Sequence, residues 1–220
     1  MCWNPDISIN TFVFGLLSLI FLFFTNMFSK YKIKSFSNSY LYLFLLEIIS
    51  VQLVEFFLWK NLDNKQLNKF LTLIILLLVG SQPPTLMMLI KEPNQRNTLL
   101  FIYGLFVLGY LGIFYLNQTH LFYTSVAKNG HLHWGNTETK SEYNRVFMFM
   151  YLIMYLLPLF FVGNYCLSIL VIISMVISLY FYLNDGTFGS MWCWMANFSF
   201  LFLLVYVLIV LPFYEYNGLC

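Results

Sequence analysis

Two groups of polar residues in this chain have the types and spacing that could support chemistry. The first is Gln52, Glu55 and Trp59, within the apolar segment QLVEFFLW. At 100° per residue these three side chains fall within about a 60° sector of a helix. A carboxylate on an apolar helix usually points into a helix bundle or a wet cavity, so Glu55 is the candidate catalytic or ligand-binding group. The alternative is a solvated carboxylate near the helix end, with Gln52 in an interhelical hydrogen bond.

The second group is the pair His131 and His133. On a strand, residues two apart lie on one face, which leaves Leu132 and Trp134 on the other. Two such imidazoles can chelate a metal such as zinc, but zinc needs three or four protein ligands. Surface histidines on a hairpin are the alternative. The side chains that could complete a metal site are Cys2, Glu55, Cys193, His120, Asp6, Asp63 and Asp185.

The elements that must position these residues are membrane helices. Of the 220 residues, 60% are hydrophobic and only 9% are charged, which is more apolar surface than a soluble domain of this size buries. A helix needs about 20 apolar residues to cross a bilayer. Seven segments have this character, and we expect a bundle of seven transmembrane helices in a single domain. They cover about 9–28, 40–59, 67–90, 98–116, 146–163, 165–184 and 190–213.

Two interruptions stand out in this pattern. The long link 117–145 contains Asn129 and Gly130 between two short strand-like stretches, which predicts a small β-hairpin with a type I′ turn. Pro83 and Pro84 remove two backbone donors and release carbonyls about four residues earlier. We interpret the proline pair as a packing kink, with a gate or a carbonyl ligand as the alternative.

The charge and the cysteine content give less information about function. The net charge of +2 is too small and too scattered to suggest a nucleic-acid partner, so the expected partner is the lipid bilayer. Lys and Arg number six on the N-terminal side and five on the other, and the basic KYKIK after the first helix favours a non-cytoplasmic N-terminus. Cys2 and Cys193 fall on the N-terminal side, where they could form a disulfide or remain free thiols.

At MCWNPDISINTF and QLVEFFLW the chain resembles a family of uncharacterised multi-pass membrane proteins from bacteria, protists and giant DNA viruses. The matching positions are Met1, Cys2, Trp3, Ser8, Gln52, Glu55 and Trp59. The chain departs from the family pattern at Asn4, often Ser there, and at Val51, often Gln. The resemblance points to particular residues and implies no activity. It suggests that Cys2 lies beside the Gln52–Trp59 end of the second helix, where these residues would form a pocket on the N-terminal face.

Three functions fit these features. One is an intramembrane metal-dependent hydrolase acting on lipid, with seven helices and His and Asp near one face as in alkaline ceramidases. His131 and His133 would then hold the metal, and Glu55 would move the proton. The second is a transporter, channel or receptor-like protein. Retinal is not expected, because 190–213 contains no Lys for a Schiff base. The third is a structural membrane protein of a virion or organelle.

Overall fold

The computed structural model describes residues 4–116, 123–134, 142–162 and 165–216, and most of these are helical. The last four helical elements follow one another without a break, so the helices form seven rods. The predicted segments are confirmed as helices, with ends that differ by at most five residues. The bounds are α1 (Pro5–Phe28), α2 (Ser39–Lys60), α3 (Lys65–Met87), α4 (Pro93–Leu116), α5 (Glu142–Val162), α6 (Tyr165–Tyr182), α7 (Phe188–Ala196), α8 (Phe198–Val205), η2 (Tyr206–Val210) and α9 (Leu211–Tyr216), with a 3₁₀ turn, η1 (Lys34–Ser37), before α2.

The first three helices begin with the same device. The side-chain oxygens of Asn4, Asn38 and Asn64 accept hydrogen bonds from backbone N–H groups in the first turns of α1, α2 and α3. An Asn at this position satisfies a donor that has no partner within the helix. These helices therefore begin at polar caps, one to four residues before the apolar segments from which they were predicted.

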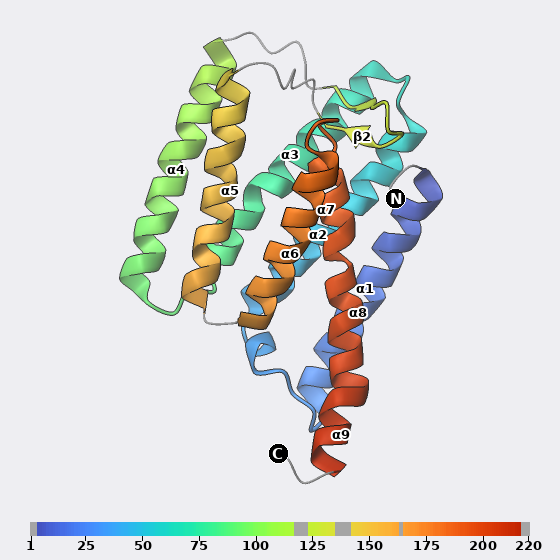
Figure 1. Cartoon of the computed structure of the whole chain (residues 1–220), viewed down its shortest axis with the longest axis vertical. Helices are drawn as coiled ribbons and strands as arrows, with labels where there is room; N and C mark the ends of the chain where they lie inside the picture. The colour runs from blue at the N-terminus through green and yellow to red at the C-terminus, as the bar shows by residue number, and fades with distance from the viewer. Residues whose placement is uncertain (1–3, 117–122, 135–141, 163–164, 217–220) are drawn as a thin grey trace.

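Helix α2 is the centre of the bundle, between α1 and α3 and also in contact with α7. Figure 1 shows the beginning of the chain at the same end of the bundle as the hairpin, and the end of the chain at the opposite end. Four rods are long and apolar enough to cross a membrane: α1, α2, α3 and the rod from Phe188 to Tyr214. Of these, α2 is the most buried, so polar groups on it lie deep in the protein.

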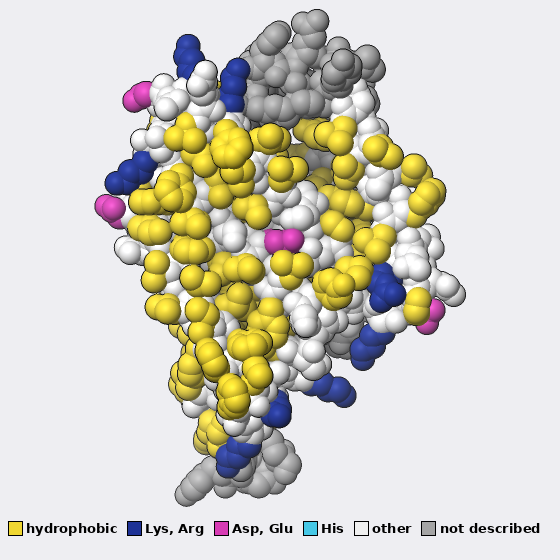
Figure 2. Space-filling model, turned by 180° about the vertical axis from the view of Figure 1, so that it is seen from behind, with side chains coloured by type: hydrophobic (Ala, Val, Ile, Leu, Met, Phe, Trp, Pro, Cys, Tyr) yellow, Lys and Arg dark blue, Asp and Glu magenta, His cyan; other side chains and the backbone are white. Residues whose placement is uncertain are grey.

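Apolar side chains also cover much of the outer surface. Figure 2 shows hydrophobic side chains spread over the face seen from behind, with Lys and Arg toward its margins. Large exposed side chains on several helices include Phe28, Leu77, Phe101, Phe160 and Tyr180. Water does not favour such a surface, whereas lipid does.

The proline pair lies inside α3 without ending it. The hydroxyl of Tyr151 donates to the Val79 carbonyl at 3.1 Å, and that of Tyr103 donates to the Gly80 carbonyl at 2.5 Å. These carbonyls are four residues before the two prolines, where the missing N–H groups would have bonded. Hydroxyls from α4 and α5 therefore replace the lost helical bonds, which supports the packing interpretation of Pro83 and Pro84.

The predicted hairpin is present, but its turn is different. Strands β1 (Ser125–Val126) and β2 (Leu132–His133) pair antiparallel. Backbone bonds from Gly130 N to Ala127 O and from Ala127 N to His131 O enclose a three-residue loop, in which Gly130 has φ 80°. The predicted two-residue type I′ turn was therefore wrong, because the pairing of the first strand ends one residue earlier, at Ala127, and a bulge forms at the glycine.

Candidate functional site

Glu55 is the centre of a buried polar cluster at the hairpin end of the bundle. Its side chain is fully buried and accepts three hydrogen bonds. Gln52 Nε2 donates at 2.9 Å, Trp134 Nε1 donates at 3.0 Å, and Ser190 Oγ donates a short bond to the same carboxylate oxygen as the indole. We call Gln52, Glu55, Trp134 and Ser190 the Glu55 cluster.

The members of the Glu55 cluster come from three different elements of the structure. Gln52 lies one turn before Glu55 on α2, so helix geometry alone brings the two together. Trp134 follows β2 directly, and Ser190 lies in the first turn of α7. The Trp indole can only donate a hydrogen bond, and charge-assisted bonds to a carboxylate are the strongest, so the arrangement suits an ionised carboxylate.

One side of the hairpin is anchored to α3. The Asn68 amide accepts from the Thr124 backbone N–H at 2.8 Å and donates to the Thr124 carbonyl at 3.0 Å, as a neighbouring strand would. The hydroxyls of Thr72 and Thr124 lie 2.7 Å apart. All three side chains are fully buried. The start of the hairpin is therefore fixed to the first turns of α3 by polar contacts.

The other side of the hairpin rests on the link between α6 and α7. Asn129 Nδ2 donates to Asp185 at 3.0 Å and to Thr187 at 2.9 Å. A Cβ atom on Gly186 would lie 2.8 Å from the His133 imidazole, and one on Gly189 would lie 2.9 Å from the Trp134 ring. Gly186 in this link and Gly189 in the first turn of α7 therefore make room for two side chains of the hairpin, which covers the Glu55 cluster.

The two histidines lie on one face of the hairpin, as predicted. The His131 ring packs against Tyr182 at a centroid distance of 5.4 Å, and the His133 ring lies against Gly186, so both face the α6–α7 link. Leu132 and Trp134 pack instead in an apolar cluster with α2 and α3 side chains. Burial lowers the pKa of His133 below its usual value of 6.5, which favours the neutral ring.

The described residues do not complete a metal site around these histidines. Within 4–116, 123–134, 142–162 and 165–216, no group of three or more His, Cys, Asp or Glu is placed to hold a metal ion. Two of the side chains considered as further ligands, Cys2 and His120, lie outside these residues. Zinc binding by His131 and His133 therefore remains a prediction, and no step of a reaction is assigned to it.

The remaining sequence candidates have different outcomes. Cys2 lies outside the described residues. Trp59 is half-buried, and its indole nitrogen has no hydrogen-bond partner in the described part of the chain, so it packs near the Glu55 cluster without bonding to it. Cys193 is a free, buried thiol on α7, one turn beyond Ser190. Ser8, which the resemblance includes, is fully buried in α1.

Sequence reasoning missed two members of the Glu55 cluster. The alternation placed Trp134 on the face of the hairpin opposite the histidines, but it did not indicate which of the two faces meets the bundle. Ser190 gave no signal, because a serine at the start of an apolar helix is commonplace. Its importance depends on α7 lying beside α2, which no local pattern predicts.

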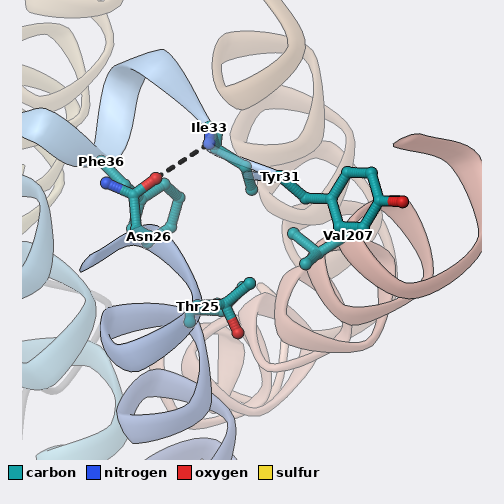
Figure 3. A pocket seen from close by; sticks show the side chains of 7 residues that line it. Thr25, Asn26, Tyr31, Ile33, Phe36 and Val207 are labelled. Carbon is teal, nitrogen blue, oxygen red and sulfur yellow. Dashed lines mark hydrogen bonds between the residues drawn. The ribbon is translucent and has the colours of Figure 1, made fainter. Parts of the chain in front are cut away.

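A shallow hollow lies at the other end of α1. Figure 3 shows Thr25, Asn26, Ile33 and Phe36 around it, with Val207 from the last rod. The one hydrogen bond drawn there joins Asn26 Oδ1 to the Ile33 backbone N–H at 2.9 Å. This hollow is mainly apolar and contains no titratable group but the Tyr31 phenol, so it is a weaker candidate than the Glu55 cluster.

Comparisons with protein-family models, with curated proteins and with solved structures find no match to this chain. The geometry of the Glu55 cluster is therefore the feature from which a function is inferred.

Proposed function

We propose that this chain is a seven-helix membrane protein that takes up a small cation at Glu55 and passes it into the bundle, as a transporter or channel. The observation that carries the proposal is the buried Glu55 carboxylate, bonded by neutral donors from three separate segments. Neutral donors can be exchanged for a cation without breaking an ion pair. A carboxylate in a membrane helix commonly marks an ion or proton pathway.

The position of the hairpin allows it to control the access of the cation to Glu55. It lies outside the helices, yet its Trp134 contributes one of the three bonds to Glu55. Movement of the hairpin away from the α6–α7 link would remove that bond and expose the carboxylate to the N-terminal face. The hairpin is thus the element that opens and closes the site.

Membrane insertion is part of the same proposal. Four rods have the length and composition of membrane spans, and apolar side chains are exposed on the others as well. We place all seven rods in the bilayer, with the N-terminus on the non-cytoplasmic side. Membership of the family that the sequence resembles is proposed on the Gln52, Glu55 and Trp59 pattern, two of whose members bond to each other.

The test is ion flux in liposomes that contain the purified protein. Dyes for protons, sodium and potassium inside the liposomes report the entry of each cation after a gradient is imposed. We expect flux of one cation in the wild type and its loss in Glu55→Gln, which keeps the size of the side chain and removes its charge. Glu92→Gln is the matched control, because Glu92 is exposed in the link between α3 and α4.

Each result has a clear meaning. Loss of flux in Glu55→Gln, with wild-type flux in Glu92→Gln, supports the proposal. Equal flux in both variants, or flux no faster than in protein-free liposomes for all three cations, contradicts it. A correctly folded Glu55→Gln protein, judged by its thermal unfolding, is required before its flux is compared.

A further inference from the structure

A second set of buried polar groups lies farther from the hairpin end of the bundle than the Glu55 cluster. Glu47 is 8% exposed, and Gln82 and Tyr155 are fully buried. Four polar atoms of these residues have no hydrogen-bond partner in the described part of the chain: Glu47 Oε2, Gln82 Nε2 and Oε1, and the Tyr155 hydroxyl oxygen. A buried polar group without a partner costs free energy, so groups of this kind in native proteins usually bond to ordered water.

These groups lie at neighbouring levels of the bundle. Glu47 Oε1 accepts from Thr85 Oγ1 on α3 at 3.0 Å, and Gln82 lies one turn before Thr85 on the same helix. Because α3 runs antiparallel to α2, that turn displaces Gln82 from Glu47 toward Glu55. Tyr155 on α5 lies within electrostatic range of Glu47 and makes an edge-to-face contact with the α7 side chain Trp192 at 4.5 Å.

Cys193 connects this inner set to the Glu55 cluster. It is one turn beyond Ser190, which bonds to Glu55, and it lies beside the Gln82 amide. Glu47 and Glu55 are eight residues apart on α2, or about 12 Å along the helix axis. Polar groups are therefore present at successive levels between the two carboxylates.

We propose that Glu47, Gln82 and Tyr155 bind water molecules that carry a proton between Glu47 and Glu55. This deepens the proposed function and rests on it, because it identifies the cation as a proton. In the transfer, a proton leaves the carboxyl group of Glu55, crosses the water molecules and bonds to the carboxylate of Glu47. The charge moves from one carboxylate to the other, and no other covalent bond changes in the protein.

The mixture of groups favours a proton over a metal cation. A metal cation takes several oxygen ligands at once, whereas the Gln82 amide nitrogen, which also has no hydrogen-bond partner in the described residues, can only donate. Water can bond to donors and acceptors together. On the other side of Glu47 lie buried apolar side chains such as Leu41, Phe44 and Leu45, so the polar groups described here connect Glu47 with the N-terminal face. The titratable side chains around the site are Glu55, Tyr103, Tyr151, Tyr155 and Cys193.

Infrared difference spectroscopy of the protein in lipid nanodiscs tests the inference. On acidification we expect the carbonyl stretch of a protonated carboxyl group that is lost in Glu47→Gln and retained in Glu92→Gln. We also expect water bands that shift in water labelled with heavy oxygen. These bands should be lost in Gln82→Met and kept in Gln95→Met, the same substitution at an exposed position on α4.

The wild-type spectrum alone can overturn the inference, so a variant that fails to fold does not decide the outcome. A wild type with no oxygen-sensitive water band, or carboxyl bands that are identical in the wild type and in folded Glu47→Gln, contradicts it. Flux of sodium or potassium in place of protons also contradicts it. If Glu55→Gln abolishes cation flux while these spectral signals are missing, the inner site fails and the proposed function stands. If Glu55→Gln leaves flux unchanged, the proposed function fails.

Discussion

The bond between Trp134 and Glu55 gives the sharpest prediction about how the hairpin is held. Trp134→Phe keeps an aromatic ring and removes only the indole donor, which lies 3.0 Å from the carboxylate. Hydrogen bonds to charged groups contribute about 1.5–3 kcal/mol. We therefore expect the free energy of opening the hairpin to fall by about that amount, since Glu55 keeps its bonds to Gln52 and Ser190.

Amide hydrogen exchange measured by mass spectrometry follows this opening directly. The N–H groups of Thr124 and Ala127 are bonded only while the start and the turn of the hairpin are formed. A factor of ten corresponds to about 1.4 kcal/mol, so exchange in a peptide covering 123–134 should quicken by roughly 10- to 150-fold.

Trp59→Phe is the matched control for this change. Trp59 packs in the same apolar cluster as Trp134, but its indole nitrogen has no hydrogen-bond partner in the described residues. The same substitution there removes similar ring area and no bond, so hairpin exchange should stay close to that of the wild type. Equal acceleration in both variants would show that ring size, and not the bond to Glu55, holds the hairpin.

Three further predictions concern stability, measured by thermal unfolding in nanodiscs. Tyr103→Phe removes the donor to a carbonyl released by the proline pair and should cost about 1–3 kcal/mol, whereas Tyr180→Phe at an exposed position should change stability by less than about 0.5 kcal/mol. Gly189→Ala crowds the hairpin indole and should cost about 1–3 kcal/mol, whereas Gly104→Ala, with open space around it, should not destabilise. Burial lowers the pKa of His133, so the unfolded chain binds more protons at this residue than the folded chain does. The free energy of unfolding should therefore decrease as the pH drops below about 6.5. In His133→Gln this contribution to the pH dependence should be absent. Opposite orders within either pair, or an unchanged pH dependence in His133→Gln, would contradict these assignments.

The helices were predictable because each depends on a long local pattern. A run of about 20 apolar residues predicts a long helix, and Asn129 with Gly130 predicts a turn between two short strands. The exact turn was not predictable, because two- and three-residue loops around the same glycine differ only in where the strand pairing ends. That position is fixed by distant contacts such as Asn129 with Asp185.

Two of the four residues in the Glu55 cluster were predictable, because only these two are close together in the sequence. Gln52 and Glu55 lie one turn apart, so their meeting follows from one helix. Ser190 and Trp134 reach Glu55 from 135 and 79 residues away along the chain, and only the packing of α7 and the hairpin on α2 brings them there. Likewise, Pro83 and Pro84 indicate released carbonyls, but nothing in α3 indicates that tyrosines from two other helices bond to them.

The central claim is that the Glu55 carboxylate exchanges its bonds to the protein for a proton. The most direct measurement is the infrared difference spectrum of wild-type protein, Glu55→Gln and Glu92→Gln in lipid nanodiscs as the solution is acidified. The account predicts a carboxyl band from Glu55 that appears in the wild type and in Glu92→Gln and is missing from Glu55→Gln. Identical spectra for wild type and folded Glu55→Gln would show that Glu55 takes up no proton, and would contradict the account.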